Sequence, residues 1–289
     1  MSLAVLIPAY NAARTLGEVL SRIQGLSVED RIIVVDDGSS DATAAIAQQD
    51  SRVHLVRHAQ NVGYGHASTT LYDEALRLGA TAMVNVHADG AHFPEEIPLV
   101  MGPILRGEAD IVVGSRTLGI LSTLRPVLGS RTLGACLHGP MPVGRFIPNL
   151  LLTAYQNWCY GTSFHSFHDG FRACTRQVLE RVPYRACTAW YQFDTQFLLA
   201  AHEAGMRIRE VGVGTHYMSR PSSSTPPIRY GLRVVGHASR YAIERRVPHA
   251  WRRVTSREST PPQAGLATPS LDPTLDEQAE TATSLDRRS

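Results

Sequence analysis

The strongest constraint on the fold is a repeated alternation between short apolar runs and segments with helical spacing. The apolar runs are Leu3–Pro8, Arg31–Val35, Val53–Val56, Ala82–Val86 and Asp110–Val113. The segments between them are Thr15–Ile23, Ala42–Gln49, His66–Leu78 and Pro94–Arg106. Runs that are apolar at nearly every position suit strands buried on both faces, as in a parallel sheet. Strands that alternate with helices predict right-handed crossovers and an open α/β sheet.

The second half of the chain is less regular. Residues 116–161 are rich in Gly, Pro, Leu and Arg with weak periodicity, which predicts loops and short helices. Further on, the pattern predicts helices at Thr175–Val182, Asp194–Ala204 and Ile228–Arg253, and a strand near Arg207–Val213. From 254 the composition turns to Ser, Thr, Pro, Ala and acidic residues, which cannot bury enough apolar surface to fold. We therefore predict one domain over 1–253 and a disordered tail over 254–289.

Composition excludes several classes of protein. The formal net charge is +2, too close to zero for a protein that coats nucleic acid. The chain contains no Lys, so all 28 cationic side chains are Arg, and arginine content alone does not indicate phosphate binding. The four cysteines form no C-x-x-C pair and predict reduced core residues rather than a zinc site. We find no membrane-spanning run and no signal peptide, and so expect a cytoplasmic protein.

Three polar clusters follow predicted strands. They are Pro8–Asn11, Asp36–Asp41 and His87–His92. Because ligands of open α/β sheets collect at the carboxyl ends of strands, these clusters predict a shared site. Asp37 is equally well explained as a turn residue. Asp36 directly follows an apolar strand, where a carboxylate needs a hydrogen-bonding partner such as a nucleobase or ribose.

Other polar residues are compatible with more than one role. Asn61–Gly65 suits either a loop-to-helix turn or a phosphate-facing helix start. Arg116 and Arg172 are either ordinary ion-paired arginines or anion-binding groups at the mouth of the site. Four histidines could suggest a metal cluster, but coincidence explains them better in a chain with 12. These are His87, His92, His165 and His168.

Several of these motifs together resemble a known family. Leu6–Asn11, Val34–Asp41 and Asn61–Gly65 resemble family 2 glycosyltransferases of the GT-A fold. Val113–Arg116, Asp169–Arg172 and Phe193–Asp194 narrow the resemblance to the branch that contains dolichyl-phosphate mannose and glucose synthases. The resemblance covers about Leu3 to Arg246. It implies a nucleotide-sugar half at 1–115 and an acceptor half at 116–253 that ends in a basic helix.

The resemblance also assigns roles to residues. It implies that Asp36 and Asp37 hold the nucleoside end, that Pro8 and Tyr10 shape the base pocket, and that Gly63 belongs to the nucleotide-sugar site. The family's D-x-D motif, which holds a divalent cation, falls at 87–89. Here His87 replaces the first carboxylate, Asp89 is the remaining one, and Ala91 stands where a Gln is common. Since Mg²⁺ and Mn²⁺ prefer oxygen ligands, we expect weakened cation binding at Asp89 and His87.

The family implies an inverting transferase that moves a hexose from a GDP- or UDP-sugar to an acceptor, expected to be a polyprenyl phosphate. One alternative is a weak or inactive scaffold that only binds nucleotide sugars. A nucleotidyltransferase is less well supported, because Leu3–Thr15 lacks that class's Gly-rich basic signature.

The identity of the acceptor determines which residues do the chemistry. An anionic lipid phosphate needs only positioning and neutralisation, which Arg116 and Arg172 could supply. A hydroxyl acceptor needs a general base, for which Asp194 is the candidate, with Asp169 a weaker one. The arginines of 228–253 suit either a solvated helix face or peripheral contact with the inner face of an anionic membrane.

Overall fold

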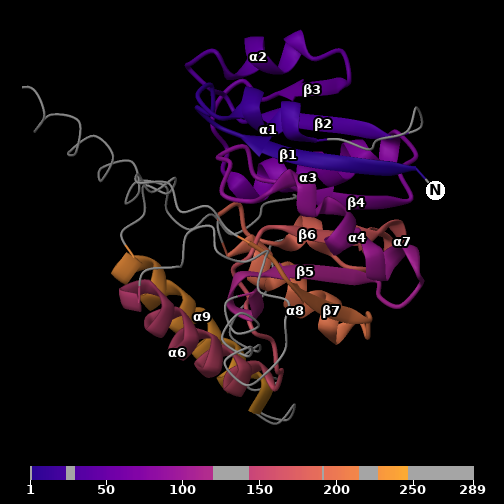
Figure 1. Cartoon of the computed structure of the whole chain (residues 1–289). Coiled ribbons are helices and arrows are strands. Elements are labelled where there is room, and N and C mark those ends of the chain that lie inside the picture. Colours follow the sequence, from indigo (N-terminus) through magenta and orange to yellow (C-terminus); the bar gives the residue numbers. More distant parts are fainter. Residues whose placement is uncertain (1, 24–29, 120–142, 191, 215–226, 247–289) are drawn as a thin grey trace, which may run out of the picture. The chain divides into compact units, whose positions relative to one another are not determined.

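A seven-stranded sheet in the order β3-β2-β1-β4-β6-β5-β7 organises the described part of the chain (Figure 1). The structure is a computed structural model that describes residues 2–23, 30–119, 143–190, 192–214 and 227–246. The strands are β1 Leu3–Ala9, β2 Arg31–Asp36, β3 Val53–Arg57, β4 Ala82–Asn85, β5 Ile111–Ser115, β6 Arg172–Thr175 and β7 Ile208–Gly212. β6 runs antiparallel to β4 and β5, and the other pairs are parallel. The predicted α/β class with a mainly parallel sheet is confirmed.

Helices cover both faces of this sheet, which explains why its strands are apolar at successive positions. The helices are α1 Leu16–Arg22, α2 Thr43–Gln49, α3 Tyr64–Arg77, α4 Ile97–Leu105, α6 Val143–Tyr160, α7 Arg176–Arg181, α8 Phe193–Glu203 and α9 Pro227–Arg246, with short 3₁₀ turns η1 Pro94–Glu96 and η3 Tyr184–Ala186. Leu6 of β1 packs in a cluster with α3 and α8, whereas its neighbour Ile7 packs with α1 and α4. Each strand therefore contributes to two cores.

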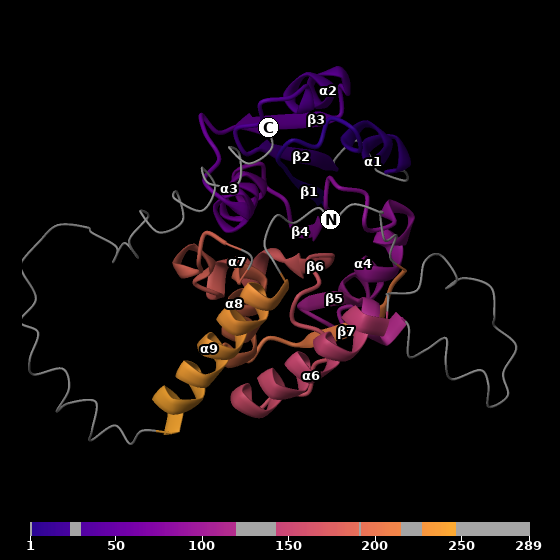
Figure 2. The same cartoon turned by 90° about the vertical axis from the view of Figure 1, so that its left-hand side faces the viewer.

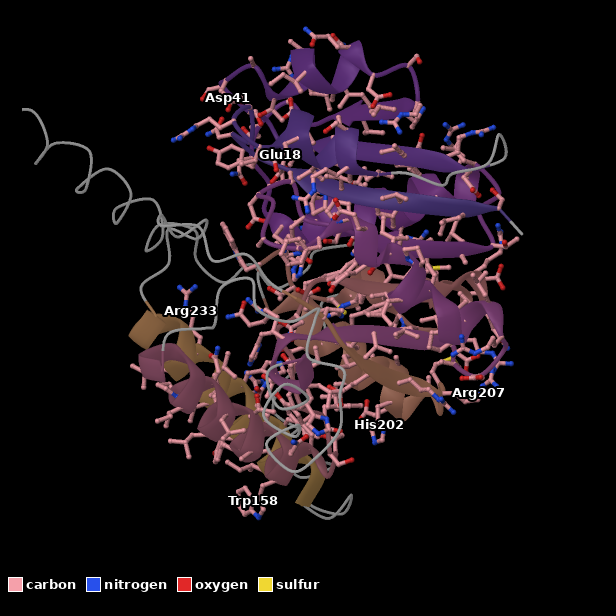
Figure 3. The ribbon with its side chains drawn as sticks, viewed as in Figure 1. Glu18, Asp41, Trp158, His202, Arg207 and Arg233 are labelled. Atoms are coloured by element: carbon pink, nitrogen blue, oxygen red, sulfur yellow. The ribbon has the colours of Figure 1, made fainter. Side chains whose placement is uncertain are left out.

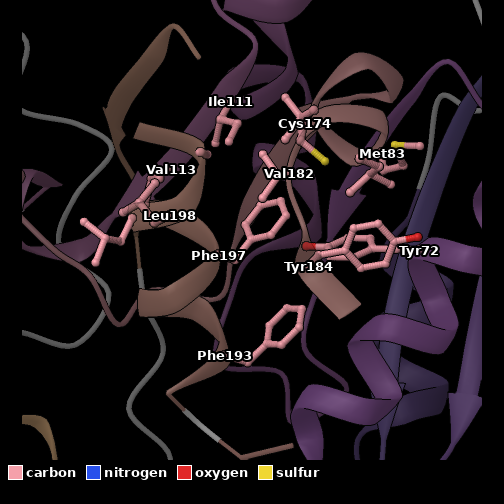
Figure 4. Close-up of a cluster of buried hydrophobic side chains, with 14 of the residues drawn as sticks. Tyr72, Met83, Ile111, Val113, Cys174, Val182, Tyr184, Phe193, Phe197 and Leu198 are labelled. Atoms are coloured by element: carbon pink, nitrogen blue, oxygen red, sulfur yellow. The ribbon is translucent and has the colours of Figure 1, made fainter. Parts of the chain in front are cut away.

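The first of these cores is rich in aromatic rings. Tyr72 of α3 stacks on Phe197 of α8 with ring centroids 5.4 Å apart, and Phe193 and Tyr184 lie against the same ring (Figure 4). Such pairs contribute about 0.5–1.5 kcal/mol each beyond their buried area. The cluster fixes the start of α8, and so the backbone of Asp194, relative to the sheet.

Two elements differ from the sequence prediction. Residues 143–160 form an 18-residue helix, α6, where we predicted loops and short helices. Pro148 lies inside it, which argues against a helix, and several of its apolar residues face outward. β6 was not predicted, because four residues that begin with a buried arginine do not look like a strand.

The chain divides into two compact units, Met1–Ile243 and Glu244–Ser289. In the first unit α6 lies beside α9, as Figures 1 and 2 show and as the 2.7 Å hydrogen bond between the Tyr155 and Ser239 hydroxyls requires. Of the second unit the structure describes residues 244–246, which end α9. The predicted domain end at 253 and the predicted tail over 254–289 lie outside the described residues.

Candidate active site

The three polar clusters predicted from the sequence meet at one edge of the sheet. Asn11, whose φ of 49° lies in the left-handed region, accepts a hydrogen bond from the Ser40 backbone at its Oδ1 (3.0 Å). Thr15, at the start of α1, donates its hydroxyl proton to the Ala88 carbonyl at 2.7 Å. The loops after β1, β2 and β4 are thus connected directly. A left-handed Asn at this junction stores strain of the kind found at functional sites.

Asp36 ends β2 and is fully buried. Its Oδ1 accepts a hydrogen bond from the Ser39 backbone at 3.0 Å. Its Oδ2 lies 3.1 Å from Arg57 Nε, but the two groups are not aligned for a hydrogen bond, so this oxygen has no donor. A buried acceptor without a donor costs free energy, which a donor on a ligand would recover.

Asp37 holds the loop that leads into α3. Its Oδ1 accepts hydrogen bonds from His58 Nδ1 (2.7 Å) and the Val62 backbone (3.1 Å), and its Oδ2 accepts one from the Gly63 backbone (2.9 Å). Gly63 has a φ of 97°, and a Cβ there would lie 2.7 Å from the Ala189 carbonyl oxygen. Both residues therefore shape the loop in this structure, as the turn interpretation predicted. Near the end of β1, Pro8 is half-buried, and Tyr10, directly after that strand, is exposed.

The loop after β4 carries His87 and Asp89. Asp89 accepts a hydrogen bond from the Ala91 backbone at 2.9 Å through Oδ1, across a left-handed Gly90. The His87 ring packs edge-on against His92, with centroids 5.2 Å apart. Among the residues that the structure describes, no group of three His, Cys, Asp or Glu side chains is placed to hold a metal ion. Asp89 and His87 are two side chains of this loop that could contact a divalent cation.

Two of the four histidines considered as metal ligands form hydrogen bonds to residues outside that group. His165 pairs with Glu210 at 2.9 Å, and His168 Nε2 lies 2.8 Å from Gln156 Oε1. Burial lowers the pKa of His168 to about 4, and nearby arginine charges add to this effect. His92 is also buried, and its pKa falls to about 3 because of burial and the neighbouring His87. A four-histidine metal site is not formed.

Arg116 and Asp169 form an ion pair at the end of β5. Arg116 donates to Asp169 through both its backbone N–H (3.1 Å) and its guanidinium Nε. Burial would raise the pKa of Asp169, but the charge and hydrogen bonds of Arg116 outweigh it, so the pKa lies below its ordinary value. The Arg116 side chain is 24% exposed, so it can still reach an anion in solvent.

Arg172 lies beneath the site rather than at its mouth. It is 1% exposed, and its guanidinium donates to the backbone carbonyls of Asp194 (3.0 Å) and Asp169 (2.9 Å). Its Nη2 also lies 3.4 Å from Asp194 Oδ1. This placement does not fit the predicted role of Arg172 in gripping a phosphate: its donors point into the protein.

The sequence reading missed Tyr64, the first residue of α3. Its hydroxyl donates to Asp194 Oδ1 at 3.1 Å and lies 3.5 Å from His87 Nε2. Its position directly after Asn61–Gly63, in a motif already singled out, was the available signal.

Comparison with known proteins decides the family. Residues 4–182 match the profile of glycosyl transferase family 2, which covers more than half of the chain. The chain belongs to this family. It is 29% identical over 215 residues to the polyprenol monophosphomannose synthase of Mycolicibacterium smegmatis, covering 72% of this chain and 75% of that enzyme. This glycosyltransferase is therefore similar to the branch that makes polyprenyl-phosphate sugars.

Two further comparisons support the assignment. The chain is 26% identical over 246 residues to the UDP-N-acetylglucosamine–dolichyl-phosphate N-acetylglucosaminyltransferase of Methanococcus voltae, covering 80% of this chain and 92% of that one. Glucosyl-3-phosphoglycerate synthase from Mycobacterium tuberculosis, solved with UDP, superposes with a TM-score of 0.58 at 21% identity, covering 83% and 80% of the two chains. At that identity the likeness establishes the GT-A fold alone.

Proposed function

We propose that this glycosyltransferase moves a hexose from a GDP- or UDP-sugar to a polyprenyl phosphate, with inversion at the anomeric carbon. The observation that carries the donor half of the proposal is Asp36 Oδ2, a buried acceptor without a donor at the meeting point of three strand-end loops. A nucleoside N–H or hydroxyl would supply the missing hydrogen once Arg57 moves aside. Pro8 and Tyr10 would flank the base, and Asp37 and Gly63 would shape the adjoining loop.

The loop after β4 is the part of the site that would bind the diphosphate end of the nucleotide sugar. When bound, a divalent cation such as Mg²⁺ or Mn²⁺ would neutralise charge on the leaving diphosphate. Asp89, in the turn after β4, is the residue that would hold the cation, with His87 beside it. Since the D-x-D position supplies a single carboxylate, Asp89, we expect nucleotide and cation to bind together.

Arg116 is the group that would meet the acceptor. A guanidinium can donate two parallel hydrogen bonds to a phosphate. Asp169 holds the Nε side of Arg116, which fixes the direction of the side chain. A lipid phosphate is already anionic, so positioning and neutralisation are enough for it to attack the anomeric carbon, and no general base is required.

A hydroxyl acceptor is the second candidate, and the placement of Asp194 favours it. Its Oδ1 is held by Tyr64 and Arg172, as a positioned general base would be. A scaffold that binds nucleotide sugars without transferring them remains the third reading, suggested by His87 and Ala91.

A lipid acceptor requires a membrane surface, and α6 and α9 offer a suitable face. Seven of the eleven large exposed hydrophobic side chains in the described part lie on these two helices: Ile147, Leu150, Leu151, Trp158, Leu232, Val235 and Ile243. Arg233 and Arg240 are exposed on α9, and residues 147–160 and 231–243 contain no acidic side chain. Figure 3 shows Trp158 and Arg233 projecting away from the sheet. We infer peripheral contact with anionic lipid.

In the part of the chain that the structure describes, no helix is long and apolar enough to cross a membrane.

A thermal-shift screen of UDP- and GDP-sugars, each with and without Mn²⁺, tests the donor half of the proposal. A ligand that binds the folded state raises the melting temperature by mass action. We expect one nucleotide class to stand out and Asp36→Asn to abolish its shift. A screen without any shift would contradict the proposal.

A further inference from the structure

Tyr64 joins the two halves of the site. It is the first residue of α3, and its phenol lies between the loop after β4 and the start of α8. Its hydroxyl is 3.1 Å from Asp194 Oδ1 and 3.5 Å, the long limit of a hydrogen bond, from His87 Nε2. The Tyr64 and His87 rings also meet edge-on, with centroids 5.7 Å apart. We propose that Tyr64 is a positioning residue that fixes Asp194 on the acceptor side relative to His87 on the donor side; this rests on the proposed function.

The position of the His87 side chain depends on the glycine at position 170. Gly170 lies directly beneath the imidazole, and a Cβ at Gly170 would come within 2.1 Å of His87 Nε2 and 3.2 Å of the Tyr64 hydroxyl oxygen. Any residue other than glycine would displace the ring from Tyr64. The His87 ring also packs against His92. These contacts indicate that His87 has a role of its own, and that it is not simply a lost carboxylate of the D-x-D motif.

The hydrogen bonds have one consistent direction. A phenol has a single proton, and an ionised carboxylate can only accept, so the Tyr64 proton points to Asp194. The phenol oxygen can then accept a hydrogen bond, and His87 Nε2 lies 3.5 Å from it.

The consequence is a link between donor binding and the acceptor-side carboxylate. Arg172 holds Asp194 Oδ1 from within the core, and Tyr64 holds the same oxygen from the side of the site. A change in the loop after β4 that moves His87 would be passed through Tyr64 to Asp194. Loss of the Tyr64 hydroxyl should therefore affect turnover more than donor affinity.

The test is Tyr64→Phe, which keeps the ring and its contacts and removes the hydroxyl. We expect kcat to fall about threefold to tenfold, within the limit of about tenfold expected for Asp194→Asn with a phosphate acceptor, and KM for the nucleotide sugar to change less than about twofold. The matched control is Tyr72→Phe, in the same helix and aromatic cluster. The Tyr72 hydroxyl accepts a hydrogen bond from Asn85 Nδ2 at 3.3 Å. Removal of this hydroxyl should leave kcat within about twofold of the wild-type value.

A double-mutant cycle separates positioning from packing. We expect His87→Gln to lower kcat in the wild type and to cost several-fold less in the Tyr64→Phe background, because the link is already broken. Additive effects, or an unchanged kcat in Tyr64→Phe, would overturn the inference. A wild type that binds nucleotide sugar but transfers none would instead refute the proposed function. Melting temperatures of all variants, measured alongside, identify any that fail to fold.

Discussion

Arg172 Nη2 lies 3.4 Å from Asp194 Oδ1, and the two side chains are 1% and 8% exposed. Arg172 also donates to the backbone carbonyl of Asp194 at 3.0 Å, so it contacts both the side chain and the helix turn that carries it. This ion pair joins β6 to α8 under the candidate site. Its main role in this structure is to place Asp194.

Removal of Arg172 should therefore destabilise the fold. Arg172→Ala would leave the Asp194 carboxylate buried without its cation, for which we expect a loss of about 3–5 kcal/mol in the free energy of unfolding. Urea denaturation followed by circular dichroism measures it. A stable Arg172→Ala protein that had lost only acceptor affinity would instead return Arg172 to the phosphate-binding role predicted from the sequence.

The sequence predicted the strands and helices that repeat a simple pattern. β1 to β5, β7 and the helices α1 to α4, α7 and α8 lie within a few residues of their predicted ranges, because the buried strands β1, β2, β4 and β5 are apolar at nearly every position. α6 and β6 could not be found in this way. α6 has apolar residues at helical spacing, but it lies in a segment rich in Gly and Pro and contains Pro148, whereas β6 is a short antiparallel strand with a charged first residue.

The candidate site likewise contains features that could be predicted from the sequence and features that could not. Strand-end clusters could be predicted, since parallel strands bring their carboxyl ends to one edge. The different surroundings of Arg116 and Arg172 could not be predicted. The exposure of each guanidinium depends on which residues of distant elements pack around it. Asp169 and Asp194 lie 53 and 22 residues away from the arginines they hold.

Stability should fall as the pH decreases from 6.5 to 4. Burial lowers the pKa of His168 to about 4, whereas in the unfolded chain it is about 6.5, so over this range the unfolded state binds a proton that the folded state excludes. For this group the loss is at most about 3 kcal/mol. Urea denaturation at pH 7.0, 5.5 and 4.5 measures it. His168→Gln should flatten the profile; an unchanged slope would show that other groups produce it.

Cation binding should depend on Asp89. We expect Asp89→Asn to abolish transfer and to remove any Mn²⁺-dependent gain in nucleotide affinity without unfolding the protein, because Asp89 is the one carboxylate left at the D-x-D position. Isothermal titration with nucleotide, with and without Mn²⁺, measures the effect. His87→Asp restores the usual motif: stronger cation binding would show that the motif is merely degenerate, and no gain would show that His87 has a role of its own. An Asp89→Asn variant that keeps most of its activity would disprove the assignment.

Binding to anionic vesicles should require the exposed apolar side chains of α6. Leu151 is 66% and Trp158 is 62% exposed, and we expect Leu151→Ser with Trp158→Ser to weaken co-sedimentation with phosphatidylglycerol vesicles at least tenfold. The matched control is the similarly exposed Leu105 at the end of α4, where Leu105→Ser should change nothing. Equal binding by all three proteins would exclude this face as the membrane contact.

Two variants distinguish the acceptor classes. With a phosphate acceptor, Arg116→Ala should reduce kcat/KM for the acceptor about a hundredfold, whereas Asp194→Asn should cost about tenfold or less. With a hydroxyl acceptor the order reverses, because removal of a general base typically costs about a hundredfold or more. Initial rates at saturating nucleotide sugar measure both. An inactive Asp194→Asn enzyme that still binds nucleotide sugar would favour the hydroxyl acceptor.

The most direct measurement is the transfer of labelled hexose from a nucleotide sugar into an organic-extractable product. The full-length protein is incubated with each labelled GDP- or UDP-sugar and either undecaprenyl phosphate or undecaprenol. The account predicts label in the organic phase with one nucleotide class and the phosphorylated lipid, little with the free alcohol, and none with Asp36→Asn. Label incorporated equally well into undecaprenol, or no lipid-linked label from any donor that binds, would contradict it.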